Sequence, residues 1–136
     1  MFCAASVIEF NPLTKMVEYW HGGLPDMLVL DANGLIRQSI KSSHLALGVV
    51  SEKSSKADTD FINLEENERL LVCSDGITDC CGINGEMLGE DRFEAMLDGK
   101  VDNALLFDSI VERVLHFGLG RPQNDDVLEY LCAVGL

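Results

Sequence analysis

The sequence predicts an α+β domain in which antiparallel strands come first and helices follow. Three observations favour this fold class. Short strand-like runs separated by turn residues occupy the first part of the chain, two helical patterns follow, and one further strand pattern comes last. Strands that alternate regularly with helices, as in a doubly wound sheet, are not the pattern here. At 136 residues the chain is long enough for one domain with its own core and too short for two.

Composition and charge exclude several classes of protein. The chain is 47% hydrophobic and 24% charged, which is typical of a globular protein. Its formal net charge of -13 argues against nucleic-acid and anionic-membrane partners, because phosphates would be repelled. The sequence contains neither a signal peptide nor an apolar stretch long enough to span a bilayer. Five cysteines without zinc-like spacing suit a reducing compartment, so a cytoplasmic protein is predicted.

Turn residues divide the first part of the chain into strands. The predicted strands are residues 2–10, 16–20, 27–30, 35–40 and 61–64. Asn11 and Pro12 supply turn chemistry between the first two, and Asn33-Gly34 is the strongest hairpin signal in the sequence. We expect the first four strands to form an antiparallel meander, and the polar residues 51–60 to form a loop.

Two helices and a last strand are predicted in the remainder of the chain. Residues 90–97 repeat apolar side chains with helical spacing. A longer helix is expected to begin at a cap supplied by Asp102 or Asn103 and to end at Gly118. The final strand is expected at residues 127–134.

The stretch with the clearest chemical content is a core strand that ends in an acid. Residues 70–73 form an unbroken apolar run, which is typical of a strand buried on both faces. The run stops at Ser74, Asp75 and Gly76, where a turn or a short helix begins. A carboxylate fixed in this way can bind a metal ion, but aspartate is also a common helix cap. From these residues alone, both interpretations of Asp75 are open.

A second acidic element precedes the final strand, at Asn124, Asp125 and Asp126. If the two strands are antiparallel neighbours, the end of one lies beside the start of the other, and the carboxylates can share one pocket. Such hard oxygen ligands suit Mg²⁺ or Mn²⁺ rather than zinc. Two such ions, roughly 3.5–4 Å apart, typically activate a water for attack on a phosphoryl group.

At these residues the sequence resembles a known family, the SpoIIE/RsbU-like branch of the metal-dependent type 2C (PPM) protein phosphatases. The similar segments follow the family's order and cover nearly the whole chain. They are GGLP at 22–25, LALGV at 45–49, SDGITD at 74–79, GEMLGEDRF at 85–93 and NDDVLEYLCAV at 124–134. The SDGITD segment is the most specific of them.

The resemblance implies that residues 1–136 are the C-terminal portion of a single PPM phosphatase domain. That domain is an αββα sandwich, in which this chain would supply an antiparallel meander with two helices packed on it. The family's Gly-Gly-Asp segment, which carries a bridging aspartate, has no counterpart here. The expectation is therefore that this chain alone is inactive and that it self-associates, because missing strands would leave open sheet edges.

The resemblance also implies the chemistry. Asp75 and Asp125 would coordinate Mg²⁺ or Mn²⁺, with Asp126 as an adjacent or alternative ligand. The nucleophile would be a metal-bound water, with no catalytic side chain. The implied substrate is a phosphoserine or phosphothreonine protein, often an anti-sigma-factor antagonist. The implied setting is the output domain of a bacterial response regulator.

An alternative is a degenerate phosphatase-like module that binds a partner protein and performs no chemistry. The missing bridging aspartate favours it, and so does Leu128, which stands where the family usually has threonine or serine. The three histidines (His21, His44 and His116) have no partners at ligand spacing, so structural or exposed roles are expected. Glu90 is expected to be a favourable acidic residue at a helix start rather than a ligand.

Overall fold

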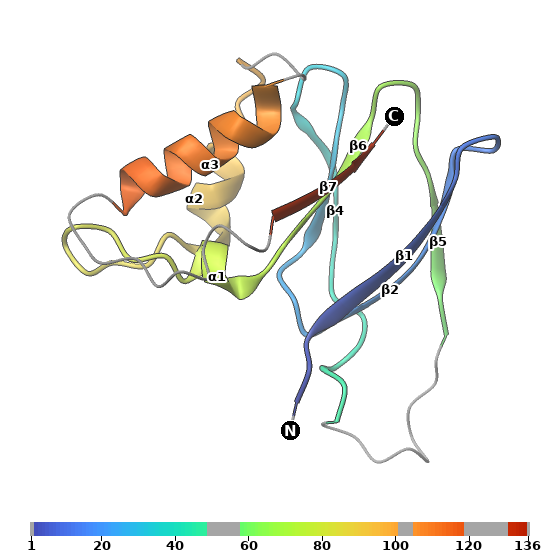
Figure 1. Cartoon of the computed structure of the whole chain (residues 1–136), viewed down its shortest axis with the longest axis horizontal. Helices are drawn as coiled ribbons and strands as arrows, with labels where there is room; N and C mark the ends of the chain where they lie inside the picture. The colour runs from blue at the N-terminus through green and yellow to red at the C-terminus, as the bar shows by residue number, and fades with distance from the viewer. Residues whose placement is uncertain (1, 49–57, 101–104, 119–130, 136) are drawn as a thin grey trace.

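The computed structural model describes residues 2–48, 58–100, 105–118 and 131–135. These residues form two antiparallel sheets, with strand orders β1-β2-β5 and β4-β3-β6-β7, and three helices (Figure 1). The strands are β1 (Ala5–Asn11), β2 (Met16–Gly22), β3 (Met27–Leu30), β4 (Ile36–Ile40), β5 (Asp60–Asn63), β6 (Arg69–Cys73) and β7 (Leu131–Gly135). The helices are α1 (Asp75–Thr78), α2 (Gly89–Ala95) and α3 (Leu106–Phe117).

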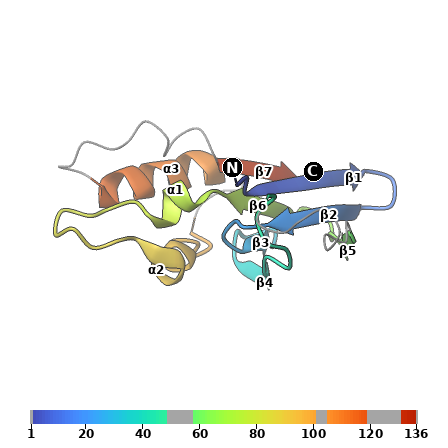
Figure 2. The same cartoon turned by 90° about the horizontal axis from the view of Figure 1, so that it is seen from below.

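The four-stranded sheet is the central layer of the described part. Its two faces contribute to two separate apolar clusters. One cluster joins the sheet to the helices, and its members include Leu28, Leu30, Leu71, Cys73, Ile77, Phe93, Ile110 and Val114. The other joins it to the three-stranded sheet, and its members include Val17, Met27, Val29, Leu70 and Val72. The helices and β1-β2-β5 therefore lie on opposite sides of the central sheet, as Figures 1 and 2 show.

Strands β3 and β6 lack polar interior positions because both of their faces are covered. All four residues of β3 are buried, and so are the four apolar residues that end β6. Successive side chains in a strand point to opposite faces, so neighbouring residues enter different clusters. Leu71 enters the helix-side cluster, whereas Leu70 enters the sheet-side cluster. The structure confirms the expectation of a strand buried on both faces at residues 70–73.

The two predicted hairpins are present, and one side-chain oxygen closes each turn. In the first turn the Asn11 carboxamide oxygen accepts two backbone N–H groups, at 3.0 and 3.2 Å. In the second, the Asp31 carboxylate accepts the N–H groups of Asn33 (2.8 Å) and Leu35 (3.0 Å). Gly34 has a φ of 80°, a conformation that glycine adopts without strain.

The hairpins do not form one continuous meander, and in this respect the structure differs from the expectation. β2 pairs with β5, and β3 pairs with β6, so the chain changes sheets between β2 and β3. Gly23, in that connection, has a φ of 72°, and a Cβ atom there would lie 2.8 Å from the Cβ of Ala46. Its N–H donates to the His44 carbonyl at 3.1 Å. Close packing of this glycine thus fixes the crossing between the sheets.

His21 anchors the same crossing from inside the protein. Its ring is fully buried, and Nε2 donates to the Pro25 carbonyl at 2.8 Å. Burial lowers the pKa of His21, although the Pro25 carbonyl and the Asp26 charge act in the opposite direction. The ring is therefore neutral, and its Nδ1 accepts the Ser6 hydroxyl. The structure confirms the structural role expected for this histidine.

The helices begin close to the predicted positions. The predicted helix at 90–97 is α2, and the longer helix is α3, which ends at Phe117 with Gly118 as its C-cap. The proposed caps Asp102 and Asn103 lie outside the described residues. None of the helices in the described part is long and apolar enough to cross a bilayer.

We predict that Leu71→Ala destabilises the protein strongly, since Leu71 is only 2% exposed in the helix-side cluster. The expected loss is about 2–5 kcal/mol in the free energy of unfolding, measured by urea denaturation. Leu13→Ala is the matched control, because Leu13 is 94% exposed in a turn; its effect should stay within about 0.5 kcal/mol. Equal losses for the two variants would contradict the layer assignment.

We also predict that His21 titrates below its ordinary pKa of about 6.5 when followed by NMR. Because folding holds the ring neutral, the unfolded chain binds this proton at a higher pH than the folded chain. The His21 contribution to stability is therefore complete above about pH 6.5 and declines as the pH falls below it. Titration of His21 above that value would show that the ring is not buried in neutral form.

Candidate metal site at the end of β6

The backbone at the end of β6 is fixed by one helical turn. Cys73 ends the strand, Ser74 occupies the N-cap position of α1, and Asp75 is the first helical residue. The Asp75 carbonyl accepts the Asp79 N–H at 2.7 Å and the Thr78 hydroxyl at 3.0 Å. Asp75 is thus carried by a buried strand and a closed turn, so its position is well defined.

The Asp75 side chain is exposed, and no described side chain or backbone N–H bonds to its carboxylate. It is not the N-cap residue, because Ser74 holds that position and makes no side-chain capping bond. A carboxylate in the first turn of a helix is still favoured by the helix dipole. The Ser74 hydroxyl oxygen is buried and has no partner among the described residues. The strand end therefore presents one free carboxylate beside one unsatisfied hydroxyl.

The hypothesis that Asp75 and Asp125 share one pocket requires their strands to be antiparallel neighbours. The pairing of β6 with β7 confirms this arrangement of the strands. The strands are antiparallel neighbours, and Cys73, at the end of β6, pairs with Leu131, at the start of β7. Asp125 and Asp126 precede β7 in the sequence and lie outside the described residues. Their coordination of a metal ion together with Asp75 stays a prediction.

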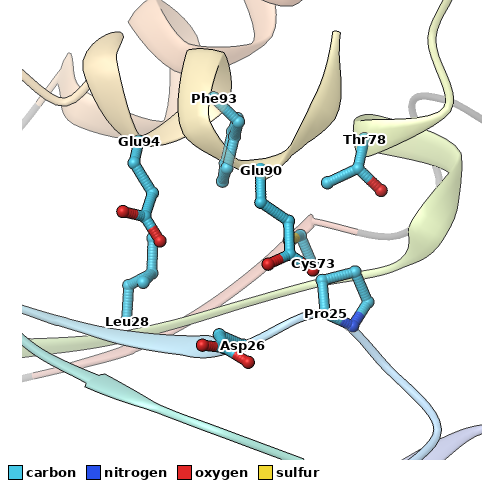
Figure 3. A pocket seen from close by; sticks show the side chains of 8 residues that line it. All are labelled: Pro25, Asp26, Leu28, Cys73, Thr78, Glu90, Phe93 and Glu94. Carbon is cyan, nitrogen blue, oxygen red and sulfur yellow. The ribbon is translucent and has the colours of Figure 1, made fainter. Parts of the chain in front are cut away.

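A small acidic cavity lies on the helix side of the same strand end (Figure 3). Asp26 enters it from the start of β3, and Glu90 and Glu94 enter it from α2, one helical turn apart. Cys73 and Phe93 supply apolar wall. The cavity encloses about 10 Å³, roughly the space of one water molecule. It is too small for a substrate.

The cavity is also not a metal centre by itself. No group of three His, Cys, Asp or Glu side chains in the described part is arranged to hold a metal ion. Burial, followed by the charge of Glu90, raises the pKa of the Cys73 thiol to about 12. The thiol is therefore protonated at neutral pH and unsuited to act as a nucleophile.

The acidic cavity is the feature that sequence reasoning missed. Glu90 lies in the first turn of α2, which confirms the prediction of an acidic helix start. The i, i+4 spacing of Glu90 and Glu94 is the signal in the sequence from which a shared helix face could have been inferred. Asp26 comes from a distant part of the chain, and only the packing of α2 near β3 brings it to the same place.

Comparison with known proteins identifies the family. The model of the family described as stage II sporulation protein E (SpoIIE) matches residues 1–132. No curated protein sequence matches the chain.

The solved structures that are similar to this chain include three phosphatase-related proteins. The SiaA-PP2C domain of Pseudomonas aeruginosa has a TM-score of 0.68 at 16% identity, covering 94% of this chain and 48% of that one. The phosphatase domain of SpoIIE from Bacillus subtilis, presoaked with Mn, has a TM-score of 0.65 at 13% identity, and the match covers 96% of this chain and 54% of that one. The structure of the RsbU and RsbW domains of Rv1364c from Mycobacterium tuberculosis has a TM-score of 0.61 at 14% identity, and the match covers 82% of this chain and 31% of that one.

These similarities confirm the predicted α+β, PPM-like fold. The chain spans about half the length of the SiaA and SpoIIE chains, and less of the third. Since the family match extends over residues 1–132, the chain belongs to the SpoIIE family of PP2C-type phosphatase domains.

Proposed function

We propose that this chain carries part of the active site of a metal-dependent protein phosphatase that hydrolyses phosphoserine or phosphothreonine. The observation that supports it most is the antiparallel pairing of β6 with β7. That pairing brings the end of β6, two residues before Asp75, beside the strand that follows Asp125 and Asp126 in the sequence. Membership of the SpoIIE family supports the same activity.

In this proposal Asp75, Asp125 and Asp126 hold Mg²⁺ or Mn²⁺. The free, exposed Asp75 carboxylate fits a hard cation, because such ions take oxygen ligands and keep several waters. When bound, the metal supplies a Lewis acid that activates water and stabilises charge on the phosphoryl group. The contribution of the chain is to fix the carboxylate, which the closed turn of α1 does through the Asp75 carbonyl.

The carboxylates that line the cavity at the same strand end serve the same purpose electrostatically. Asp26, Glu90 and Glu94 line the cavity next to Cys73, two residues before Asp75 in the chain. A concentration of carboxylates raises the local concentration of divalent cations. A phosphate ester would be repelled by these groups unless a bound cation neutralises them, and this repulsion supports the proposed metal dependence.

We further propose a regulatory setting for this activity. The similar structures include the RsbU and RsbW domains of Rv1364c, which supports a phosphoprotein partner in signalling. An anti-sigma-factor antagonist is the substrate class we propose, acted on in the bacterial cytoplasm by the output domain of a response regulator.

The second candidate function is a phosphatase-like module that binds a partner and catalyses nothing. It is favoured by Leu128, which stands where the family usually has threonine or serine. The two candidates differ in metal binding and in turnover, so the two experiments below separate them.

The first prediction concerns metal binding. Titration of the 136-residue chain with MnCl₂ in a calorimeter should show saturable binding, and Asp75→Asn should weaken it at least roughly tenfold. Asp108→Asn, a matched change at an exposed aspartate in the first turn of α3, should leave the affinity unchanged. Equal affinities for Asp75→Asn and the unaltered chain would remove Asp75 from the site.

The second prediction concerns turnover. Phosphate release from a phosphoserine protein should require Mn²⁺ or Mg²⁺, stop on addition of a chelator, and fall at least about tenfold in Asp75→Asn. The assay should use this chain and any longer natural polypeptide that contains it. Absence of release from both, with every divalent ion, would favour the non-catalytic binding module.

A further inference from the structure

The side-chain hydroxyl of Ser74 stands out at the end of β6. Among the described residues, its Oγ is the single buried side-chain nitrogen or oxygen that lacks a hydrogen-bond partner. A buried polar group of this kind destabilises the fold, because it has lost its bonds to water and gained none in return. Native structures contain few such groups, and each calls for a physical explanation.

Two ordinary explanations do not account for this hydroxyl. A serine at an N-cap usually accepts an N–H group of the first helical turn, but Ser74 makes no such side-chain bond. The Ile77 N–H is bonded instead to the Ser74 carbonyl, at 3.2 Å. An enclosed water is the other explanation, but the one-water cavity at this strand end is lined by Cys73 and Thr78 and not by Ser74 (Figure 3).

The backbone shows on which side of the sheet the hydroxyl lies. Ser74 is still extended, with a φ of -84° and a ψ of 166°, so it continues the alternation of side chains along β6. Val72 belongs to the sheet-side cluster and Cys73 to the helix-side cluster. Ser74 therefore faces the side of the three-stranded sheet, away from the acidic cavity. The free Asp75 carboxylate follows one residue later.

We propose that Ser74 is a positioning residue of the metal site, whose hydroxyl donates a hydrogen bond to a carboxylate that holds the ion. This role rests on the metal site proposed above, so the acceptor is Asp75 or one of the pair Asp125 and Asp126. Carboxylates that bind metals are held in turn by hydrogen bonds, and loss of such a bond typically weakens metal affinity about 10- to 100-fold. Because the Oγ atom is buried, it does not itself contact the substrate.

The stability of the metal-free chain and its affinity for metal should then respond to Ser74 in opposite directions. Without metal, the hydroxyl is a buried donor with no acceptor, and its removal relieves the fold of that cost. With metal, the same removal breaks a bond to a ligand. A serine that only supports the fold behaves differently, because its loss destabilises the metal-free chain. Functional sites commonly hold groups that destabilise the free protein in this way.

The test measures both quantities in the 136-residue chain. For Ser74→Ala we expect a higher midpoint of urea denaturation in the presence of a chelator. In calorimetric titration with MnCl₂, the same variant should bind at least about tenfold more weakly than the unaltered chain. Ser74→Thr keeps the hydroxyl and suits an extended residue, so it should retain most of the affinity for Mn²⁺.

Ser42→Ala is the matched control, because the Ser42 hydroxyl has partners. It accepts the Gly23 N–H at 2.9 Å and donates to the His44 carbonyl at 3.1 Å. Its removal should lower the urea midpoint and leave the affinity for Mn²⁺ unchanged.

A double-mutant cycle identifies the acceptor. If Asp75 accepts the bond, Ser74→Ala should cause little further loss of Mn²⁺ affinity in a chain that already carries Asp75→Asn. Losses that add in full would assign the bond to Asp125 or Asp126.

Three results would overturn the role of Ser74. If Ser74→Ala binds Mn²⁺ as tightly as the unaltered chain while Asp75→Asn does not, the metal site stands and Ser74 takes no part in it. If Ser74→Ala lowers the urea midpoint without metal, as Ser42→Ala does, the hydroxyl already has a structural partner. If the unaltered chain does not bind Mn²⁺, the metal site itself is removed, and the role of Ser74 with it.

Discussion

The packing of β3 and β6 on both of their faces is the constraint on which the rest of the structure depends. These two strands pair with each other, and their side chains form both the core between the sheets and the core beneath the helices. Each fully buried apolar side chain contributes on the order of 2 kcal/mol. Removing either strand would separate the helices from the three-stranded sheet, so neither layer is independent of them.

This constraint also determines where chemistry can occur. A strand held on both faces cannot shift along its axis without exposing one core, so its end is a rigid point. At that end Cys73 faces a cavity lined by Asp26 and Glu90, and Asp75 follows on a closed turn. Negative charge is thus concentrated at the end of a strand that is buried on both faces. Rigid support of this kind is what a metal-binding carboxylate requires.

The sequence predicted those features that depend on neighbouring residues. The unbroken run at 70–73 implied burial on both faces, and Asn33-Gly34 implied the second hairpin. The division of the hairpins between two sheets was not predictable, because it depends on the packing of Gly23 against Ala46. The acidic cavity was not predictable either, because tertiary contacts between distant parts of the chain form it. Periodicity shows which side chains share a face of one element, and it does not show which element that face will meet.

We propose that the end of β6, together with the residues before β7, binds the metal. Paramagnetic broadening of amide NMR signals by substoichiometric Mn²⁺ tests it directly, because the effect depends on distance from the ion. We expect the signals of residues 74–79 and of the start of β7 to broaden first. Broadening centred on Glu94, near the C-terminal end of α2, with the Asp75 turn unaffected, would place the ion in the acidic cavity and contradict metal binding at Asp75.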